Sequence, residues 1–229
     1  MLKKNIPAIF FCIGKNMAKY EDDLIYAINN GFIIGNHAFN HKHFSDLNLK
    51  DAYKEIRDTD KIIELLYLKA KIKRPIKVFR FPYLDKGAHL HSKDYRNNWM
   101  KYSNNEKKNK IQNYLKKLGY TRPLFENINI NWYNKSGLLK DVDVYCTFDQ
   151  MEYFLGNEDA PYGLSGESAI LARIEEDYPE EGRSLNFSKT SDIIMIHDHE
   201  KTTRLFFKLI NAYLKKGIIF KLPRFKTFK

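Results

Sequence analysis

The sequence predicts an α/β fold with mostly parallel strands. Strand-like and helix-like segments alternate along the 229 residues, which is the pattern of such folds. Hydrophobic residues make up 43% of the chain, enough for one sizeable core, and no repeat or low-complexity linker interrupts it. Polar motifs also follow directly after apolar runs. We therefore expect one domain over 1–229, with functional residues at strand ends.

The first third of the chain gives the clearest elements. Residues 8–13 and 32–34 are apolar runs typical of buried strands. Between them, residues 18–30 place Leu24, Ile25 and Ile28 on one helical face, and Gly31 ends that helix. Asn48 is expected to cap a long helix with Asp51 at the capping-box position. The helix breaks at 74–75, and 76–81 is the next expected strand.

The remainder alternates with less regular spacing. Residues 84–104 form a polar connection and 156–190 an acidic loop and helix. Helices are expected at two apolar-periodic segments that each end before a glycine, 106–118 and 202–216. Strands are expected at 124–130, 142–148, 193–196 and 218–222.

Charge, hydropathy and cysteine content argue against several classes of protein but do not identify a function. The 39 Lys and Arg residues exceed the 28 acidic ones and give a net charge of +11, but they are spread along the chain. Without a basic stripe or a recognised motif, a nucleic-acid partner is not expected. No apolar run reaches ~18 residues, so no transmembrane segment is expected. Cys12 and Cys146 fit buried free thiols. The start lacks a cleavage site, so a cytoplasmic location is the default.

His37 and His41 form the first motif with chemical meaning. On a helical turn this spacing would put both imidazoles on one side, within reach of one ion. His43 leaves an alternative open, because His41 and His43 could pair instead.

Two further motifs follow expected strands. Arg80 ends one strand, where its charge needs a partner such as a carboxylate. Pro82 stiffens the backbone, so the Tyr83 N–H could point in a fixed direction and stabilise an oxyanion. His197 ends another strand and could give a proton to a leaving amine near neutral pH. Side chains at strand ends are typical of a β/α barrel, so Arg80 and His197 are expected to share a cavity with the histidine pair.

Together these motifs resemble the NodB-homology polysaccharide deacetylases, carbohydrate esterase family 4. Gly35-Asn-His-Ala-Phe-Asn-His41 is similar to the His-x-x-x-His motif of the family, with Ala38 in place of the usual Ser or Thr. Arg80-Phe-Pro-Tyr83 and Met195-Ile-His-Asp198 are similar to its third and fifth motifs. The closing segment YLKKGIIFKL also resembles the family.

The resemblance implies a distorted (β/α) barrel of the NodB type and a metal-dependent hydrolase that removes acetyl groups from N-acetylated amino sugars of a polysaccharide or glycoconjugate. His37 and His41 would bind a divalent metal, Zn²⁺ or Co²⁺. Arg80 would orient the catalytic carboxylate, and His197 would be the general acid. Tyr83 would bind substrate through its N–H, and Trp132 could line the acetyl pocket or belong to the core.

Two departures shape the expected activity. The family's Thr-Phe-Asp-Asp motif, which carries the base and a third metal ligand, would lie upstream of residue 1, so an incomplete barrel without its first strand is expected. Asn131 stands before Trp132 where the family has Asp, and Asn cannot support an imidazolium as an anion would; Asp143 or Asp149 could substitute. We expect an impaired enzyme or, alternatively, an inactive carbohydrate-binding remnant of the same fold.

Overall fold

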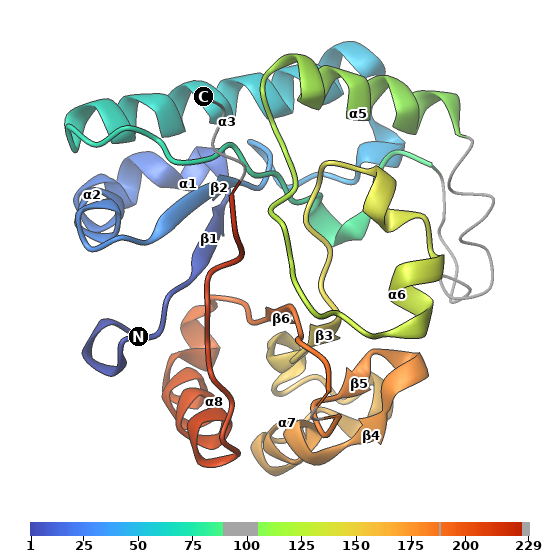
Figure 1. Cartoon of the computed structure of the whole chain (residues 1–229). Helices are drawn as coiled ribbons and strands as arrows, with labels where there is room; N and C mark the ends of the chain where they lie inside the picture. Colours follow the sequence, from blue (N-terminus) through green and yellow to red (C-terminus); the bar gives the residue numbers. More distant parts are fainter. Residues whose placement is uncertain (89–104, 188, 226–229) are drawn as a thin grey trace. The chain divides into compact units, whose positions relative to one another are not determined.

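The computed structural model describes residues 1–88, 105–187 and 189–225. It divides into two compact units. The N-terminal unit comprises Leu2–Leu124, Ser136–Tyr145 and Lys221–Lys229, and the C-terminal unit comprises Met1, Phe125–Lys135 and Cys146–Phe220. Both units combine helices with short strands, which agrees with the expected α/β class (Figure 1). No helix among the described residues is both long and apolar enough to cross a membrane.

Parallel strands form the centre of the N-terminal unit. Strand β1 (Ile9–Cys12) pairs in parallel with β2 (Ile33–Asn36). The segment after α3 continues this arrangement, because Asn36 bridges Phe79 in parallel and the Arg80 N–H donates to the Asn36 carbonyl at 3.0 Å. Gly35 allows the Phe11 side chain on β1 to lie against β2, since a Cβ at residue 35 would be only 2.7 Å from the Phe11 ring. His37 and Arg80 therefore follow neighbouring parallel segments at the same edge.

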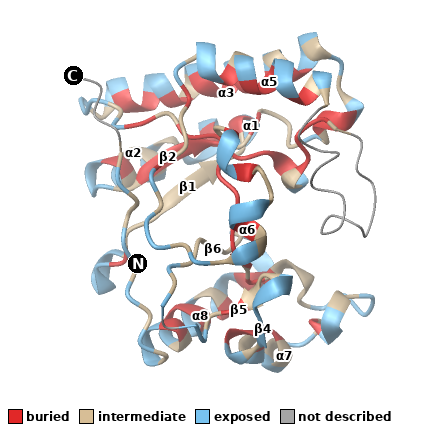
Figure 2. Cartoon of the chain, turned by 45° about the vertical axis from the view of Figure 1, so that its right-hand side comes forward, coloured by how far each residue is buried: buried red, intermediate tan, exposed pale blue. Residues whose placement is uncertain are grey.

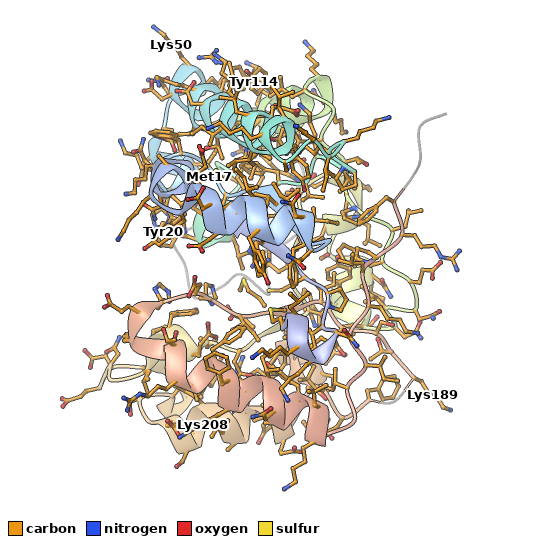
Figure 3. All side chains as sticks on the ribbon, turned by 90° about the vertical axis from the view of Figure 1, so that its left-hand side faces the viewer. Met17, Tyr20, Lys50, Tyr114, Lys189 and Lys208 are labelled. Atoms are coloured by element: carbon orange, nitrogen blue, oxygen red, sulfur yellow. The ribbon has the colours of Figure 1, made fainter. Side chains whose placement is uncertain are left out.

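The described residues of this unit include the helices α1 (Gly14–Met17), α2 (Glu21–Asn29), α3 (Leu49–Lys69) and α5 (Glu106–Lys117). Asn48 caps α3 as expected, accepting from the Asp51 N–H at 2.9 Å. Helices α3 and α5 lie side by side and bury the faces turned towards the strands (Figures 1 and 2). Two side chains in and just after α1 differ in burial: Met17 is buried, whereas Tyr20 is exposed (Figure 3).

The C-terminal unit is built from shorter pieces. Strand β3 (Phe148–Asp149) pairs in parallel with β6 (Ile194–Met195), while β4 (Asp177–Tyr178) and β5 (Arg183–Ser184) form an antiparallel pair. Its helices are α6 (Asn131–Lys135), α7 (Glu167–Ala172) and α8 (Thr203–Lys215). Tyr213 on α8 donates a buried hydrogen bond to the Gln150 side chain, which ties α8 to the end of β3.

Several expected strands are shorter than the sequence suggests or absent from the described residues. Residues 124–130 and 218–222 form no β-strand, although Leu124 makes an isolated antiparallel bridge with Arg224. Of 142–148, only Phe148 belongs to a strand. The expected strand at 76–81 is present as isolated bridges at Lys77 and Phe79. The described strands form three two-stranded sheets rather than a closed barrel. Most of the expected polar connection at 84–104 lies outside the described residues.

Candidate metal and hydrolase site

The histidine motif begins directly after β2 and is held by Asn36. This fully buried side chain accepts from the Ala38 N–H at 2.9 Å and donates to the Ile56 carbonyl and the Tyr120 hydroxyl. The Tyr120 hydroxyl in turn donates to Asp60 at 2.7 Å, and burial together with the Asp60 charge raises the pKa of Tyr120. The first turn of the motif is thereby anchored to α3 and to the segment after α5.

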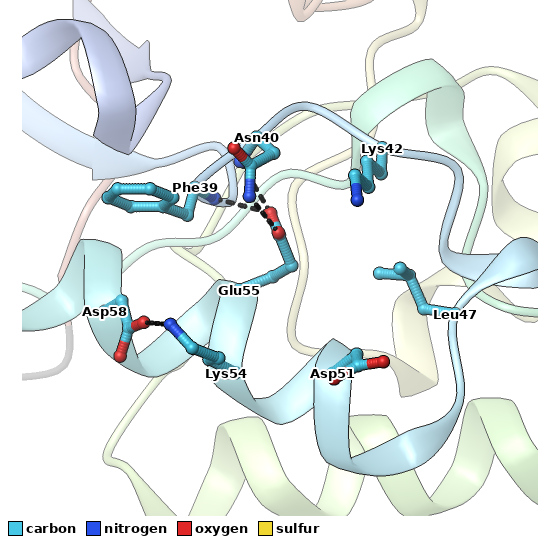
Figure 4. A pocket seen from close by; sticks show the side chains of 8 residues that line it. All are labelled: Phe39, Asn40, Lys42, Leu47, Asp51, Lys54, Glu55 and Asp58. Atoms are coloured by element: carbon cyan, nitrogen blue, oxygen red, sulfur yellow. Dashed lines mark hydrogen bonds and ion pairs between the residues drawn. The ribbon is translucent and has the colours of Figure 1, made fainter.

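Glu55 holds the middle of the same loop. Its buried carboxylate accepts from the Phe39 N–H at 2.9 Å and from the backbone and side-chain N–H groups of Asn40 at 2.6 and 2.7 Å (Figure 4). A pocket of about 250 Å³ lies beside this clamp, lined by both loop and α3 residues, including Lys42 and Lys54. Because a charged acceptor makes stronger hydrogen bonds than a neutral one, Glu55 fixes the loop more firmly than an amide would.

The expectation of a helical turn between the two histidines is wrong. Residues 37–43 form a loop, and two of them have left-handed backbone angles, Ala38 at φ +61° and His41 at φ +59°. Non-glycine residues adopt this region rarely and at a cost in free energy. The reversal at these two positions turns the chain back on itself, which brings the imidazoles together without a helix.

The two imidazoles face each other through their Nε2 atoms. His37 Nε2 and His41 Nε2 lie 3.2 Å apart, less than twice a Zn–N bond of about 2.0–2.1 Å. His37 Nδ1 lies 2.8 Å from the Arg80 carbonyl oxygen, which can only accept, so Nδ1 carries the proton and the Nε2 lone pair remains available. A backbone carbonyl behind a histidine is the usual second partner of a metal ligand. The donor set fits a divalent metal.

The Arg80 and Tyr83 segments complete the surroundings of this pair. Arg80 is buried, and the contact shown with the histidines runs through its backbone carbonyl. Tyr83 has φ +55°, and its ring packs edge-on against His41 at 4.6 Å and stacks on His43 at 4.0 Å. The Tyr83 N–H makes no hydrogen bond to any residue that the structure describes. His43 lies instead with its Nδ1 3.4 Å from Asp85, so the pairing of His41 with His37 is the one observed.

Asp143, one of the two carboxylates considered as a substitute, is committed elsewhere. It accepts from Gln112 at 2.7 Å and lies 3.0 Å from the Lys86 ammonium. Lys86 and Asp143 are both buried, and Asp141 pairs with the same lysine. This satisfied network is structural, because removing one partner would leave a buried charge unpaired.

Asp149 lies near His197 as considered from the sequence, together with Glu152, which sequence reasoning missed. Asp149 is the last residue of β3, and His197 lies two residues after its parallel partner β6. One ligand atom from each of the three side chains lies within 4.8 Å of the others. Glu152 accepts a hydrogen bond from the His197 N–H, and its Oε1 lies 3.2 Å from His197 Nδ1. The His197 ring also contacts Tyr153 edge-on at 4.5 Å.

Trp132 lies on α6 of the C-terminal unit. Its indole N–H donates to the Pro179 carbonyl at 3.0 Å, and its ring packs edge-on against Tyr133. Asn131, the residue before it, begins the same short helix. The structure thus brings His37, His41, Arg80 and Tyr83 together in one unit. That Trp132 and His197 share their cavity remains a prediction.

Comparison with known protein families shows to which family this chain is related. The family description "Polysaccharide deacetylase" matches residues 1–123, more than half of the chain and all four of the grouped residues. The chain belongs to the polysaccharide deacetylase family. The sequence-based resemblance to this family is therefore confirmed, and the matched segment contains the histidine loop, the Glu55 clamp and Arg80.

Two curated polysaccharide deacetylases from Bacillus are similar over short stretches. The peptidoglycan-N-acetylmuramic acid deacetylase PdaC of Bacillus subtilis is 39% identical over 57 residues, which cover 25% of this chain and 12% of that protein. A peptidoglycan-N-acetylglucosamine deacetylase of Bacillus cereus is 31% identical over 62 residues, 27% of this chain and 22% of that protein. The matched stretches thus cover less than a quarter of either relative.

Solved structures with the same fold cover nearly the whole chain. A family 4 carbohydrate esterase from Streptomyces lividans, in complex with acetate, aligns over 96% of this chain and 81% of its own at a TM-score of 0.57 and 16% identity. A family 4 pseudoenzyme from Bacillus anthracis aligns over 94% of this chain and 53% of its own at a TM-score of 0.54 and 12% identity. At these identities the likeness concerns the polysaccharide deacetylase fold alone.

Proposed function

We propose that this polysaccharide deacetylase hydrolyses the acetamide of N-acetylated amino sugars in a polysaccharide or glycoconjugate, giving acetate and a free amine. The observation that carries the proposal is the pair of Nε2 atoms at 3.2 Å, with the His37 tautomer set by the Arg80 carbonyl. The family match and the peptidoglycan substrates named for the two Bacillus relatives support the substrate class.

His37 and His41 would hold a divalent metal, Zn²⁺ or Co²⁺. When bound, such an ion polarises a carbonyl oxygen and lowers the pKa of water. The chain's own groups would act around it. The Tyr83 N–H would donate to the oxyanion of the attacked carbonyl, and Arg80, as the family resemblance implies, would orient a catalytic carboxylate. Their positions beside the histidine pair support these roles.

His197 would give a proton to the leaving amine, and Trp132 would line the acetyl pocket. For these roles the two residues must meet the histidine pair at one rim, as in the distorted barrel that the family resemblance implies. Histidine suits this task because its ordinary pKa lies near neutrality. His197 lies two residues after β6, and this position just beyond a strand end supports the proposal.

A second function is favoured by one residue. Asn131 precedes Trp132, where a deacetylase of this family has an acidic residue, and an amide provides no negative charge to a protonated imidazole. We therefore propose low hydrolytic activity, with an inactive carbohydrate-binding protein as the alternative function.

Acetate release separates the two functions. The chain would be incubated with acetylated chito-oligosaccharides or peptidoglycan fragments and added Zn²⁺ or Co²⁺, and binding of the same glycans would be measured by calorimetry. We expect slow release that falls by about 10²-fold or more in His197→Ala, as for loss of a general acid. Glycan binding without any acetate release would favour the binding protein. Neither release nor binding would contradict both functions.

A further inference from the structure

The ends of β3 and β6 carry a second group of metal-binding side chains that the proposed function does not use as such. We infer that Asp149, Glu152 and His197 bind a divalent first-row transition-metal cation. Their ligand atoms lie within 4.8 Å of one another. Asp149 pairs with Met195 in the parallel ladder of β3 and β6, and this pairing brings the segment that carries His197 beside Asp149.

The state of Glu152 is the strongest argument. Its side chain is 0% exposed, and while Oε1 accepts from the His197 N–H, the buried Oε2 has no hydrogen-bond partner. Among the residues that the structure describes, no lysine or arginine lies within ion-pair distance of this carboxylate. An isolated carboxylate is costly to bury, because its hydration is lost without replacement. A cation beside Oε2 would remove that cost.

A protonated His197 is the alternative neutralising group, and the geometry favours it less. His197 Nδ1 lies 3.2 Å from Glu152 Oε1, yet this buried nitrogen makes no hydrogen bond, since the approach is poorly aligned. A divalent cation beside Glu152 Oε2 would offset the charge of this carboxylate and would use the Nδ1 lone pair of a neutral imidazole.

The surroundings hold the three groups in place. Arg173 Nε donates to the Asp149 carbonyl at 2.7 Å, and the Met151 N–H donates to Asp149 Oδ1 at 3.0 Å. The Tyr153 ring packs edge-on against the imidazole. One nitrogen and two carboxylate oxygens suit zinc, cobalt or manganese, and three protein ligands leave room for water or another ligand.

Cation and proton would compete for the same imidazole. An ion on Nδ1 keeps His197 neutral, so occupancy of this site would prevent the acid role given to His197 above. This consequence rests on the proposed function, whereas binding itself does not. The test therefore measures metal directly and does not depend on acetate release.

The experiment titrates Co²⁺ into the metal-free double variant His37→Ala/His41→Ala and follows the visible absorption of the bound ion. This variant lacks the histidine pair of the N-terminal unit, so we expect one equivalent of Co²⁺ from the second site. Adding Glu152→Gln or Asp149→Asn should weaken that binding by about 100-fold or more, beyond the 10–100-fold typical of outer-shell changes. Glu158→Gln and His199→Ala are matched controls and should leave it unchanged.

Thermal unfolding provides a readout that does not depend on colour. Saturating Zn²⁺ should raise the Tm of the double variant by about 5–10 °C, the shift expected at ~100 times Kd for a chain of this size. The Glu152→Gln form should unfold at the same or a higher temperature without metal, because a buried charge is removed, and should show no shift with Zn²⁺. A double variant that binds no Co²⁺ and shows no shift, or equal binding after Glu152→Gln, would overturn the inference.

Discussion

His37 and His41 face the same point in space but are held by different means. A carbonyl fixes the His37 ring and its tautomer, whereas His41 is positioned by a left-handed backbone and by the Tyr83 ring. A hydrogen bond to the backbone leaves less freedom than ring contacts do. We therefore expect His37 to be the better ordered of the two ligands before metal binds.

Removal of either histidine should abolish metal binding at this pair. His37→Ala and His41→Ala each delete one of two nitrogen ligands, so the Zn²⁺ content that depends on this pair, measured after dialysis in the Glu152→Gln background, should fall close to zero. His43→Ala is the matched control, because His43 contacts Asp85 and Tyr83 instead. Equal metal content in all three variants would show that the pair is not a ligand pair.

Glu55 should act on metal affinity without touching the metal. Glu55→Gln keeps the size of the side chain but replaces a charged acceptor of three N–H groups, so the loop between the histidines should loosen. We expect metal affinity at the pair to fall on the order of 10–100-fold, as for other outer-shell partners. Asp23→Asn, an exposed change on α2, serves as the control in the same competition titration. An unchanged affinity would mean that the loop keeps its shape without the carboxylate.

At the scale of elements, α3 has the largest share in building the site. It carries Glu55 to the loop and Asp60 to the network behind Asn36, on a face buried against β2. Its start is therefore a sensitive point. Asn48→Ala removes the cap that accepts from the Asp51 N–H and should cost about 1 kcal/mol of unfolding free energy.

Thermal unfolding measures this cap. A cost of that size should lower the Tm of Asn48→Ala by about 2–4 °C, whereas Lys50→Ala, on the exposed side of the same turn, should stay within 1 °C or so. Figure 3 shows Lys50 projecting from α3. Equal values for both variants would indicate that α3 is held by packing alone.

Long periodic elements could be predicted from the sequence, whereas short strands could not. The predicted helices at 106–118 and 202–216 correspond to α5 and α8 within about two residues, since a repeated apolar face and a closing glycine mark both ends. The apolar run at 218–222 predicts a strand but forms no ladder among the described residues. Apolar composition indicates burial, and pairing depends on neighbours that are distant in sequence.

The candidate site was predictable where a motif carries it. His37, His41 and Arg80 come after parallel segments, so their grouping follows from parallel topology. The spacing of the two histidines predicts a helical turn, whereas the chain forms a loop there. Glu152 carried no comparable signal, because an acidic residue soon after a strand is usually solvated. Its burial against His197 arises from the fold of the chain after β3, which no local pattern specifies.

At the scale of the whole molecule, acid should destabilise the fold through one buried network. Burial tends to raise the pKa of Asp60, but hydrogen bonds from Lys77, Arg74 and Tyr120 outweigh it and hold the pKa below its ordinary 3.8. Glu64 is likewise held below 4.5 despite its partial burial, by Lys77 and Arg74. The unfolded chain therefore binds protons more readily, so this stabilisation is complete above these ordinary values and is lost as pH falls below them.

Urea unfolding at a series of pH values from about 6 to 3 tests this prediction. The wild-type free energy of unfolding should decrease steadily below about pH 4.5. Asp60→Asn should be less stable by up to about 3 kcal/mol near pH 6, because Arg74 loses a buried partner, and should show a shallower pH dependence. Asp58→Asn, whose lysine partner is exposed, should change stability by less than about 1 kcal/mol. Parallel pH profiles for wild type and Asp60→Asn would exclude Asp60 as the source.

The left-handed backbone of the two site loops limits which sequences can encode them. Ala38, His41, Tyr83 and Leu84 all have φ between +55° and +61°, where β-branched side chains are strongly disfavoured. In a saturation library selected for metal retention, position 38 should therefore accept Gly, Asn and Ala and reject Val, Ile and Thr. Substitution tolerance at this buried position would report on backbone geometry more than on hydrophobicity. A sequence profile weighted by chemical similarity alone would therefore predict the wrong set of tolerated residues at position 38.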